Sequence, residues 1–216
     1  MDVALGIWTD SPVEERSAGG YRGSGVVLAD GDLVGRARTG DQAAFSTLFE
    51  QFHAQILNYI HRMVNDRSLA EDLTQDTFIK AWNALGGTRP DLAFKPWLYR
   101  IATNTAISHL RRRKLIQWIP FVGGDEDLHP SNESIEGNVT RSLDIDQALK
   151  RLPKHYVAVL LLRHYQGLSL AETANALNIT ENAAKLRLFR ARKAFAEVYD
   201  VDTQGALEPN QTEGSR

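Results

Sequence analysis

The most constraining feature of this sequence is the segment 169–193, in which two helical patterns are separated by about three residues. Ser169 and Glu172 match a capping box, in which each side chain bonds a free backbone N–H of the first helical turn. Asn178 tolerates the left-handed conformation that often ends a helix, and Thr180 is a favourable N-cap for the next helix. The first helix carries an apolar stripe formed by Ala171, Ala174 and Leu177. The segment therefore predicts a helix-turn-helix, which places its second helix in a DNA major groove.

The second helix of this motif has an apolar face and a basic face. At about 100° per residue, the side predicted to face the core carries Ala184, Leu188, Ala191 and Phe195. The candidates for DNA contact lie at the helix start, on the opposite side and on its flanks, and they are Thr180, Asn182, Lys185, Leu186, Arg187, Phe189, Arg190 and Lys193. Every charged residue between positions 182 and 196 is basic. A hairpin with a merely solvated basic face is the alternative, but such a face more often mixes Glu with Lys, so DNA contact is favoured.

Charge is distributed unevenly along the 216 residues, although the formal net charge is only -2. Two basic blocks, 31–114 with a charge of +4 and 141–199 with +5, alternate with three acidic segments. The acidic segments are 1–30 (-3), 115–140 (-5) and 200–216 (-3). This asymmetry is typical of domains that contact phosphate, joined and flanked by segments that do not.

Several functional classes are disfavoured. The chain has no cysteine, which excludes a disulfide framework and a thiolate metal site within it. His53 and His61 are eight residues apart, and His155 and His164 are nine apart, so neither pair has the i,i+4 spacing of a zinc site. With no catalytic triad or Gly-rich phosphate loop either, neither an enzyme nor a cofactor is expected. A signal peptide is not apparent, and the longest aliphatic run, 157–162, is far shorter than the roughly 20 residues of a membrane helix, so we expect a cytoplasmic protein without membrane insertion.

Hydrophobic periodicity predicts an all-α fold with two small helical domains. Asp41 is the expected cap of a long helix whose apolar positions recur at three- and four-residue spacing. A second helix begins near Ser68 and ends at Gly86, and a third begins near Pro96 and ends in the basic run 111–114. The expected divisions are a disordered extension 1–30, a helical domain 31–114, a flexible acidic linker 115–140, a helical domain 141–199 that ends in the helix-turn-helix, and a disordered tail 200–216.

Three motifs in this order resemble the bacterial RNA polymerase sigma factors of the extracytoplasmic-function (ECF) group, in the sigma-70 family. Residues 70–82 (AEDLTQDTFIKAW) are similar to region 2.2, and residues 94–106 (FKPWLYRIATNTA), with the basic end that follows, to regions 2.3 and 2.4. Leu152-Pro153, 167–169 (GLS) and 190–193 (RARK) are similar to region 4. The resemblance implies a promoter-specificity subunit that binds core polymerase, recognises the -35 and -10 elements and promotes promoter melting. The implied partners are core RNA polymerase, through the largest subunit's coiled coil and the flap, promoter DNA and an anti-sigma factor.

The resemblance also assigns roles to residues of the first domain. An exposed acidic and amide patch in region 2.2 suits a basic protein surface, and the expected polymerase-binding residues are Asp72, Gln75, Asp76 and Phe78. The loop 86–93 is where the family holds a base that has left the stack, and Thr88, Arg89 and Asp91 are its hydrogen-bonding side chains. The remaining -10 candidates are Asn104 and His109 for the upstream edge, and Arg100, Arg111, Arg112, Arg113 and Lys114 for phosphates. Trp97 and Tyr99 are candidates for base stacking, with Trp97 favoured as a core residue.

The second helix of the helix-turn-helix departs from the family pattern. Family members usually have a small polar residue at the position of Leu186 and a Thr-Val pair at positions 183 and 184. Leu186 and Phe189 have no hydrogen-bonding group for a base edge, but either can contact a thymine methyl. Recognition of the -35 element is therefore expected to depend on Lys185, Arg187 and Arg190, with an altered sequence preference.

Two other functions are compatible with parts of the pattern. A stand-alone transcriptional regulator would use the helix-turn-helix on an operator and the first domain as a sensor or dimeriser. Residues 70–82 and the basic end at Lys114 argue against it, because a repressor needs neither. An all-α adaptor or enzyme is disfavoured because no catalytic constellation is visible.

Overall fold

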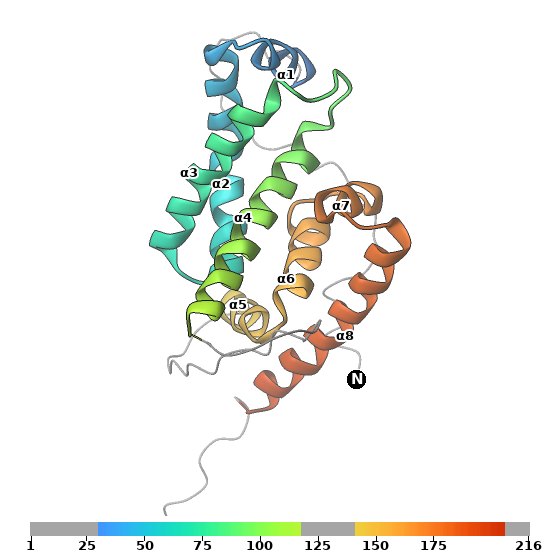
Figure 1. Ribbon diagram of the computed structural model, residues 1–216. Helices are drawn as coiled ribbons and strands as arrows, with labels where there is room; N and C mark the ends of the chain where they lie inside the picture. The colour runs from blue at the N-terminus through green and yellow to red at the C-terminus, as the bar shows by residue number, and fades with distance from the viewer. Residues whose placement is uncertain (1–29, 118–140, 206–216) are drawn as a thin grey trace, which may run out of the picture.

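The computed structural model describes residues 30–117 and 141–205, and within these ranges every regular element is helical (Figure 1). The all-α class is therefore confirmed. In chain order the elements are α1 (Asp30–Arg38), α2 (Gln42–Val64), α3 (Arg67–Leu85), α4 (Phe94–Gln117), α5 (Arg141–Arg151), α6 (Lys154–Leu160), the π-helical η2 (Leu161–Tyr165), α7 (Leu170–Leu177) and α8 (Glu181–Gly205). Most of the predicted extension, linker and tail lies outside the described residues.

Side-chain caps begin α2 and α3, two of the three long helices of the first unit, which comprises α1 to α4. Asp41 accepts a hydrogen bond from the backbone N–H of Ala44 (3.1 Å), so the predicted cap of α2 is confirmed. Helix α3 begins one residue before Ser68, because Asp66 caps it by accepting from the N–H of Leu69 (3.0 Å). Both caps satisfy backbone donors that would otherwise have no partner in the first turn.

Several element boundaries differ from the expectation. Helix α4 continues to Gln117 and α8 to Gly205, so each extends into a segment expected to be irregular. No Gly or Pro interrupts α4 after Pro96 or α8 before its last residue, so nothing in either sequence stops the helix earlier. The first unit also has a fourth helix, α1, whose buried Leu33 and Val34 pack beside α2.

Helix α6 and η2 form the centre of the second unit, which comprises α5 to α8 with η2. The aliphatic run 157–162 is buried at every position, which is expected of a helix that is hydrophobic all round. The helix then widens into a π turn, in which the N–H of Gln166 donates to the carbonyl of Leu161 (2.9 Å). Gly167 follows with a φ of 68°, in the left-handed region that glycine adopts without strain. This turn ends the helix and directs Gln166 toward the first unit.

The two units are docked on each other in this structure, with α4 lying alongside α7 (Figure 1). The Tyr99 hydroxyl on α4 donates to Gln166 Oε1 (2.5 Å), and Lys95 Nζ donates to the Gln166 carbonyl (2.8 Å). On α2, Arg62 pairs with Asp146 of α5 (3.1 Å), and its guanidinium lies 3.9 Å from the centre of the Tyr165 ring. One continuous cluster of buried apolar residues runs through both units.

Candidate nucleic-acid and protein interfaces

The caps predicted for the helix-turn-helix are confirmed. The Ser169 hydroxyl accepts from the N–H of Glu172 (3.2 Å), and the Glu172 carboxylate accepts from the N–H of Ser169 (2.8 Å). Asn178 ends α7 in the left-handed conformation (φ 54°), and Thr180 caps α8 through the N–H of Ala183 (3.2 Å). The predicted apolar stripe of α7 is wrong at Ala171, which is exposed; the buried residues of this helix are Thr173, Ala174 and Ala176.

Removal of the capping box is expected to destabilise the protein. Ser169→Ala should lower the free energy of unfolding by about 1 kcal/mol, because the N–H of Glu172 loses its acceptor. Urea unfolding followed by circular dichroism measures this change. Ser108→Ala is the control, since Ser108 is exposed within α4 and caps no helix, and it should alter the free energy by less than about 0.5 kcal/mol.

The same cap makes the stability of the protein pH-dependent. The backbone N–H of Ser169, and then its side chain, hold the pKa of Glu172 below the ordinary value of 4.5. A carboxyl whose pKa is lowered by folding contributes stability above its unfolded pKa and loses it as the pH falls through the folded pKa. The cap contribution should therefore be full above about pH 5 and decline below it. Glu172→Gln keeps the hydrogen bond and should remove this pH dependence.

Helix α8 presents the predicted face to solvent. The residues expected in the core, Ala184, Leu188, Ala191 and Phe195, are all buried. Of the candidates for DNA contact, all are exposed except Arg187, which is half-buried. Two large apolar side chains stand among them, since Phe189 is 67% exposed and Leu186 is 49% exposed. The outer face of α8 is therefore basic, and it also carries two large apolar side chains, Leu186 and Phe189, that remain largely exposed.

The loop expected to hold an unstacked base is anchored from α1. Arg38 donates two hydrogen bonds to the Thr88 carbonyl (2.6 and 3.2 Å), a contact that sequence reasoning missed because the two residues are 50 positions apart. The Thr88 hydroxyl donates a hydrogen bond to the Leu85 carbonyl (2.6 Å), so its proton is not available to a base. Arg89 and Asp91 are exposed and 3.8 Å apart, and both remain available at the end of the loop.

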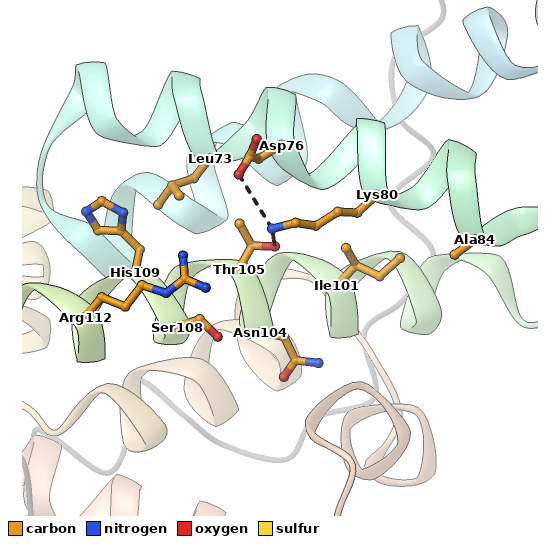
Figure 2. Close-up of a pocket in the computed structure, with 10 residues that line it drawn as sticks. All are labelled: Leu73, Asp76, Lys80, Ala84, Ile101, Asn104, Thr105, Ser108, His109 and Arg112. Atoms are coloured by element: carbon orange, nitrogen blue, oxygen red, sulfur yellow. Dashed lines mark hydrogen bonds and ion pairs between the residues drawn. The ribbon is translucent and has the colours of Figure 1, made fainter.

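A polar groove of about 400 Å³ separates α3 from α4 (Figure 2). Figure 2 shows Lys80 reaching from α3 between Asp76 and Thr105, with Nζ 3.6 Å from the carboxylate and 3.2 Å from the hydroxyl. Three of the -10 candidates line this groove, namely Asn104, His109 and Arg112. Of the others, Arg100 is half-buried, Arg111 and Arg113 are exposed, and the side chain of Lys114 lies outside those described. Lys80 was missed because a lone lysine on a helix has no distinctive sequence pattern.

The region expected to bind polymerase needs one correction. Asp72, Gln75 and Asp76 are exposed on one stripe of α3, as the periodicity predicts. Phe78 is only 4% exposed and packs against the rings of Phe45, Phe49 and His53, so it has no surface left for a partner. Ile79, the next residue, is 58% exposed and lies in the middle of the stripe. The candidate polymerase interface therefore includes Ile79 and does not include Phe78.

Tyr99 and Trp97, the two aromatic residues considered for base stacking, both pack against other side chains of the protein. Tyr99 is fully buried between Tyr59 and Gln166, so the stacking role is excluded in the docked arrangement. Burial also raises the pKa of the Tyr99 phenol above its ordinary value of 10, so its hydroxyl stays protonated as a donor. Trp97 is partly buried and packs against the core and the Phe94 ring, which agrees with the core assignment.

Two further properties concern only the residues that the structure describes. No group of three or more His, Asp or Glu side chains there is placed to hold a metal ion. None of the helices in the same ranges is both long and apolar enough to span a membrane.

Comparison with known proteins identifies the family. A model of sigma-70 region 2 matches residues 48–116, and a model of sigma-70 region 4 matches residues 142–195, so that the two together span more than half of the chain. The RNA polymerase sigma-H factor of Pseudomonas aeruginosa is 38% identical over 177 residues, which cover 77% of this chain and 91% of that protein. The chain belongs to the ECF group of the sigma-70 family. This sigma factor is therefore a promoter-specificity subunit of RNA polymerase, and the comparisons give no support to a stand-alone regulator.

Other relatives agree with this assignment. The ECF RNA polymerase sigma factor SigM of Mycobacterium tuberculosis is 31% identical over 170 residues, covering 79% of this chain and 84% of SigM. Among solved structures, CnrH in complex with the cytosolic domain of CnrY has the same fold, with a TM-score of 0.61 and 24% identity over 81% of this chain and 99% of that one. RpoE from Bartonella quintana, in complex with the anti-sigma factor NepR, gives a TM-score of 0.58 and 24% identity over 73% and 98%.

Proposed function

We propose that this sigma factor directs core polymerase to promoters whose -35 element is bound by α8 and whose -10 element is bound and opened by α4 and the loop 86–93. The observation that carries the proposal is the face of α8, on which basic side chains project opposite a fully buried apolar face. The division into a polymerase- and -10-binding unit (31–114) and a -35-binding unit (141–199), joined by a linker, is part of this proposal. The protein acts in the cytoplasm and has no catalytic chemistry of its own.

Promoter opening is assigned to one side of the first unit. Arg89 and Asp91 offer hydrogen-bonding groups to a base that has left the stack, and Arg38 holds the backbone of their loop in place. Arg112 and Lys80 line the groove between α3 and α4, and together with the other α4 cations they bind strand phosphates. Base capture and phosphate binding together offset the few kcal/mol that unstacking costs.

Polymerase binding is assigned to the α3 stripe formed by Asp72, Gln75, Asp76 and Ile79. The carboxylates and the amide suit a basic partner surface, and Ile79 supplies an apolar contact at the centre of the stripe. An anti-sigma protein is proposed as the inhibitory partner, because RpoE, which has the same fold, is held in a complex with the anti-sigma factor NepR.

Transcription in vitro tests the proposed function. Purified core polymerase, with and without this protein, is supplied with a pool of promoter fragments in which both elements are randomised. We expect transcripts only when the protein is present, and we expect the transcribed fragments to share one -35 and one -10 sequence. Initiation by core polymerase that is unaffected by the protein would contradict the proposal.

Ile79→Lys is expected to weaken polymerase binding at least about 10-fold, because it places a cation against a basic partner and removes an apolar contact. Competition against a labelled wild-type chain for core polymerase measures the change. Asp32→Lys is the matched control, since it adds positive charge at an exposed site on α1, outside the stripe. If Ile79→Lys and Asp32→Lys compete equally well for core polymerase, the α3 stripe is not part of the polymerase interface.

A further inference from the structure

The exposed face of α8 carries two large apolar side chains among its cations. At about 100° per residue, the side directly opposite the buried Ala184, Leu188, Ala191 and Phe195 carries Asn182, Leu186, Phe189 and Lys193. Leu186 and Phe189 are the two apolar side chains of this outer side, and both project toward a groove occupied by this helix. Their large exposed fractions leave both free to contact DNA.

The cations differ in their distance from the centre of this outer side. Measured from the direction opposite the buried side, Lys193 lies about 10° away and Arg190 about 50° away, as far as Phe189 on the other side, whereas Lys185 lies about 90° away. Arg187 is about 110° away and half-buried, and Arg192 donates to His164 Nε2 (3.2 Å), which turns it toward the body of the second unit. This arrangement places Lys185 next to a phosphate backbone that borders a groove, and away from its floor.

Only one group on the floor of the major groove is apolar, and it is the C5 methyl of thymine. We propose that Leu186 and Phe189 read thymine methyl groups in the -35 element, while Lys185 binds a flanking phosphate. The proposal rests on the proposed function, which places α8 in the major groove. It extends the expectation from the sequence that Leu186 and Phe189 can contact a thymine methyl. It also moves Lys185, which was expected to take part in reading the -35 element, from the bases to a phosphate.

The spacing of the two side chains adds a second requirement. Leu186 and Phe189 are three residues apart, which separates them by about 4.5 Å along α8. This is close to the rise of about 3.4 Å between base pairs, so the two side chains contact neighbouring pairs. Each buried methyl should tighten binding about four-fold. A guanine or cytosine edge at either position is disfavoured as well, because its polar groups lose water and gain no partner.

Uracil substitution tests the proposal, because uracil differs from thymine only by the missing methyl. Holoenzyme made from core polymerase and the full chain selects promoters with a fixed -10 element and a randomised -35 segment. We expect thymine to be enriched at neighbouring positions. Replacing each selected -35 thymine by uracil should weaken wild-type holoenzyme binding about four-fold per contacted methyl. The Leu186→Ser, Phe189→Ser double variant should bind the thymine and uracil promoters equally.

Lys185 gives a separate readout. Lys185→Ala should reduce the salt dependence of binding by about one unit for all -35 sequences, with the thymine preference unchanged. Loss of base preference in this variant would overturn the assignment to a phosphate.

The outcomes also separate this proposal from the function on which it rests. If a scrambled -35 segment weakens binding but uracil at every selected position does not, methyl reading is wrong and the -35 role of α8 stands. If the scrambled segment binds as well as the selected one, the -35 role is wrong, and methyl reading fails with it. Selection without thymine at neighbouring positions also overturns the proposal.

Discussion

Phe195→Ala is expected to lower the free energy of unfolding of the second unit by about 3–5 kcal/mol. Phe195 is fully buried on the inner face of α8, and its ring is stacked with Tyr199 at a centroid distance of 5.6 Å. Removing the ring leaves a cavity that the helices lining it fill only in part, because they are held by their own packing. Such a loss is a large part of the 5–15 kcal/mol that stabilises a typical domain.

Thermal and urea unfolding measure this effect, and α8 itself supplies the control. Leu186→Ala also removes an aliphatic side chain from α8, but at an exposed position, and should alter the free energy by less than about 0.5 kcal/mol. Comparable losses in the two variants would mean that the inner face of α8 is not the packed one. Transcription that depends on the -35 element should fall in Phe195→Ala at temperatures where the second unit unfolds.

Gln166→Leu is expected to shift the docked arrangement of the two units toward an open one by about 5- to 150-fold. The Tyr99 hydroxyl is buried in the docked chain with Gln166 Oε1 as its acceptor, so the variant leaves a buried donor without a partner. Separation of the units exposes that hydroxyl to water. The unpaired hydroxyl therefore destabilises the docked arrangement by about 1–3 kcal/mol and leaves the fold of each unit unchanged.

Tyr99→Phe supplies the other arm of a double-mutant cycle. Alone, it should also favour the open form, because it leaves the Gln166 amide without its donor. Combined with Gln166→Leu, it removes both polar groups and should restore docking in part. The chain has no cysteine, so Glu71→Cys and Glu197→Cys introduce two specific sites for fluorescent labels. Energy transfer between the labels, followed against salt, reports docking; identical curves for all variants would show that the contact contributes nothing.

Docking has a consequence for promoter binding. The -35 and -10 elements are about 25 base pairs apart, or about 85 Å along the duplex. A compact body of about 150 residues has a radius of gyration of about 15 Å, so the docked chain is too short to reach both elements. On the proposed assignment of α8 to the -35 element and α4 to the -10 element, the open form is the one that binds a promoter, and docking lowers the apparent affinity by the fraction of closed chains. Gln166→Leu should accordingly reduce the protein concentration needed for half-maximal transcription.

Local signals account for the parts of the structure that were predicted correctly. The capping box at Ser169, the Asp41 cap and the left-handed Asn178 depend on residues within a few positions of each other, so the chain needs no distant contact to form them. The inner and outer faces of α8 follow from a period of 3.6 residues and from the chemistry of its side chains. The same reasoning failed at Ala171, because α7 is only eight residues long and its buried side is decided by α4 and α8.

The sequence by itself determined the all-α class, the helix-turn-helix, the order of the motifs and the residue types available to DNA and polymerase. Tertiary structure alone decided that Phe78 is buried and Ile79 exposed, that Arg38 anchors the loop at Thr88, and that Tyr99 bonds Gln166. The physical reason is the range of the interactions. Caps and periodicity act over one or two helical turns, whereas each of these three features depends on a surface supplied by another helix. Which side chains of an amphipathic helix remain free for a partner is therefore settled only when the other helices have packed against it.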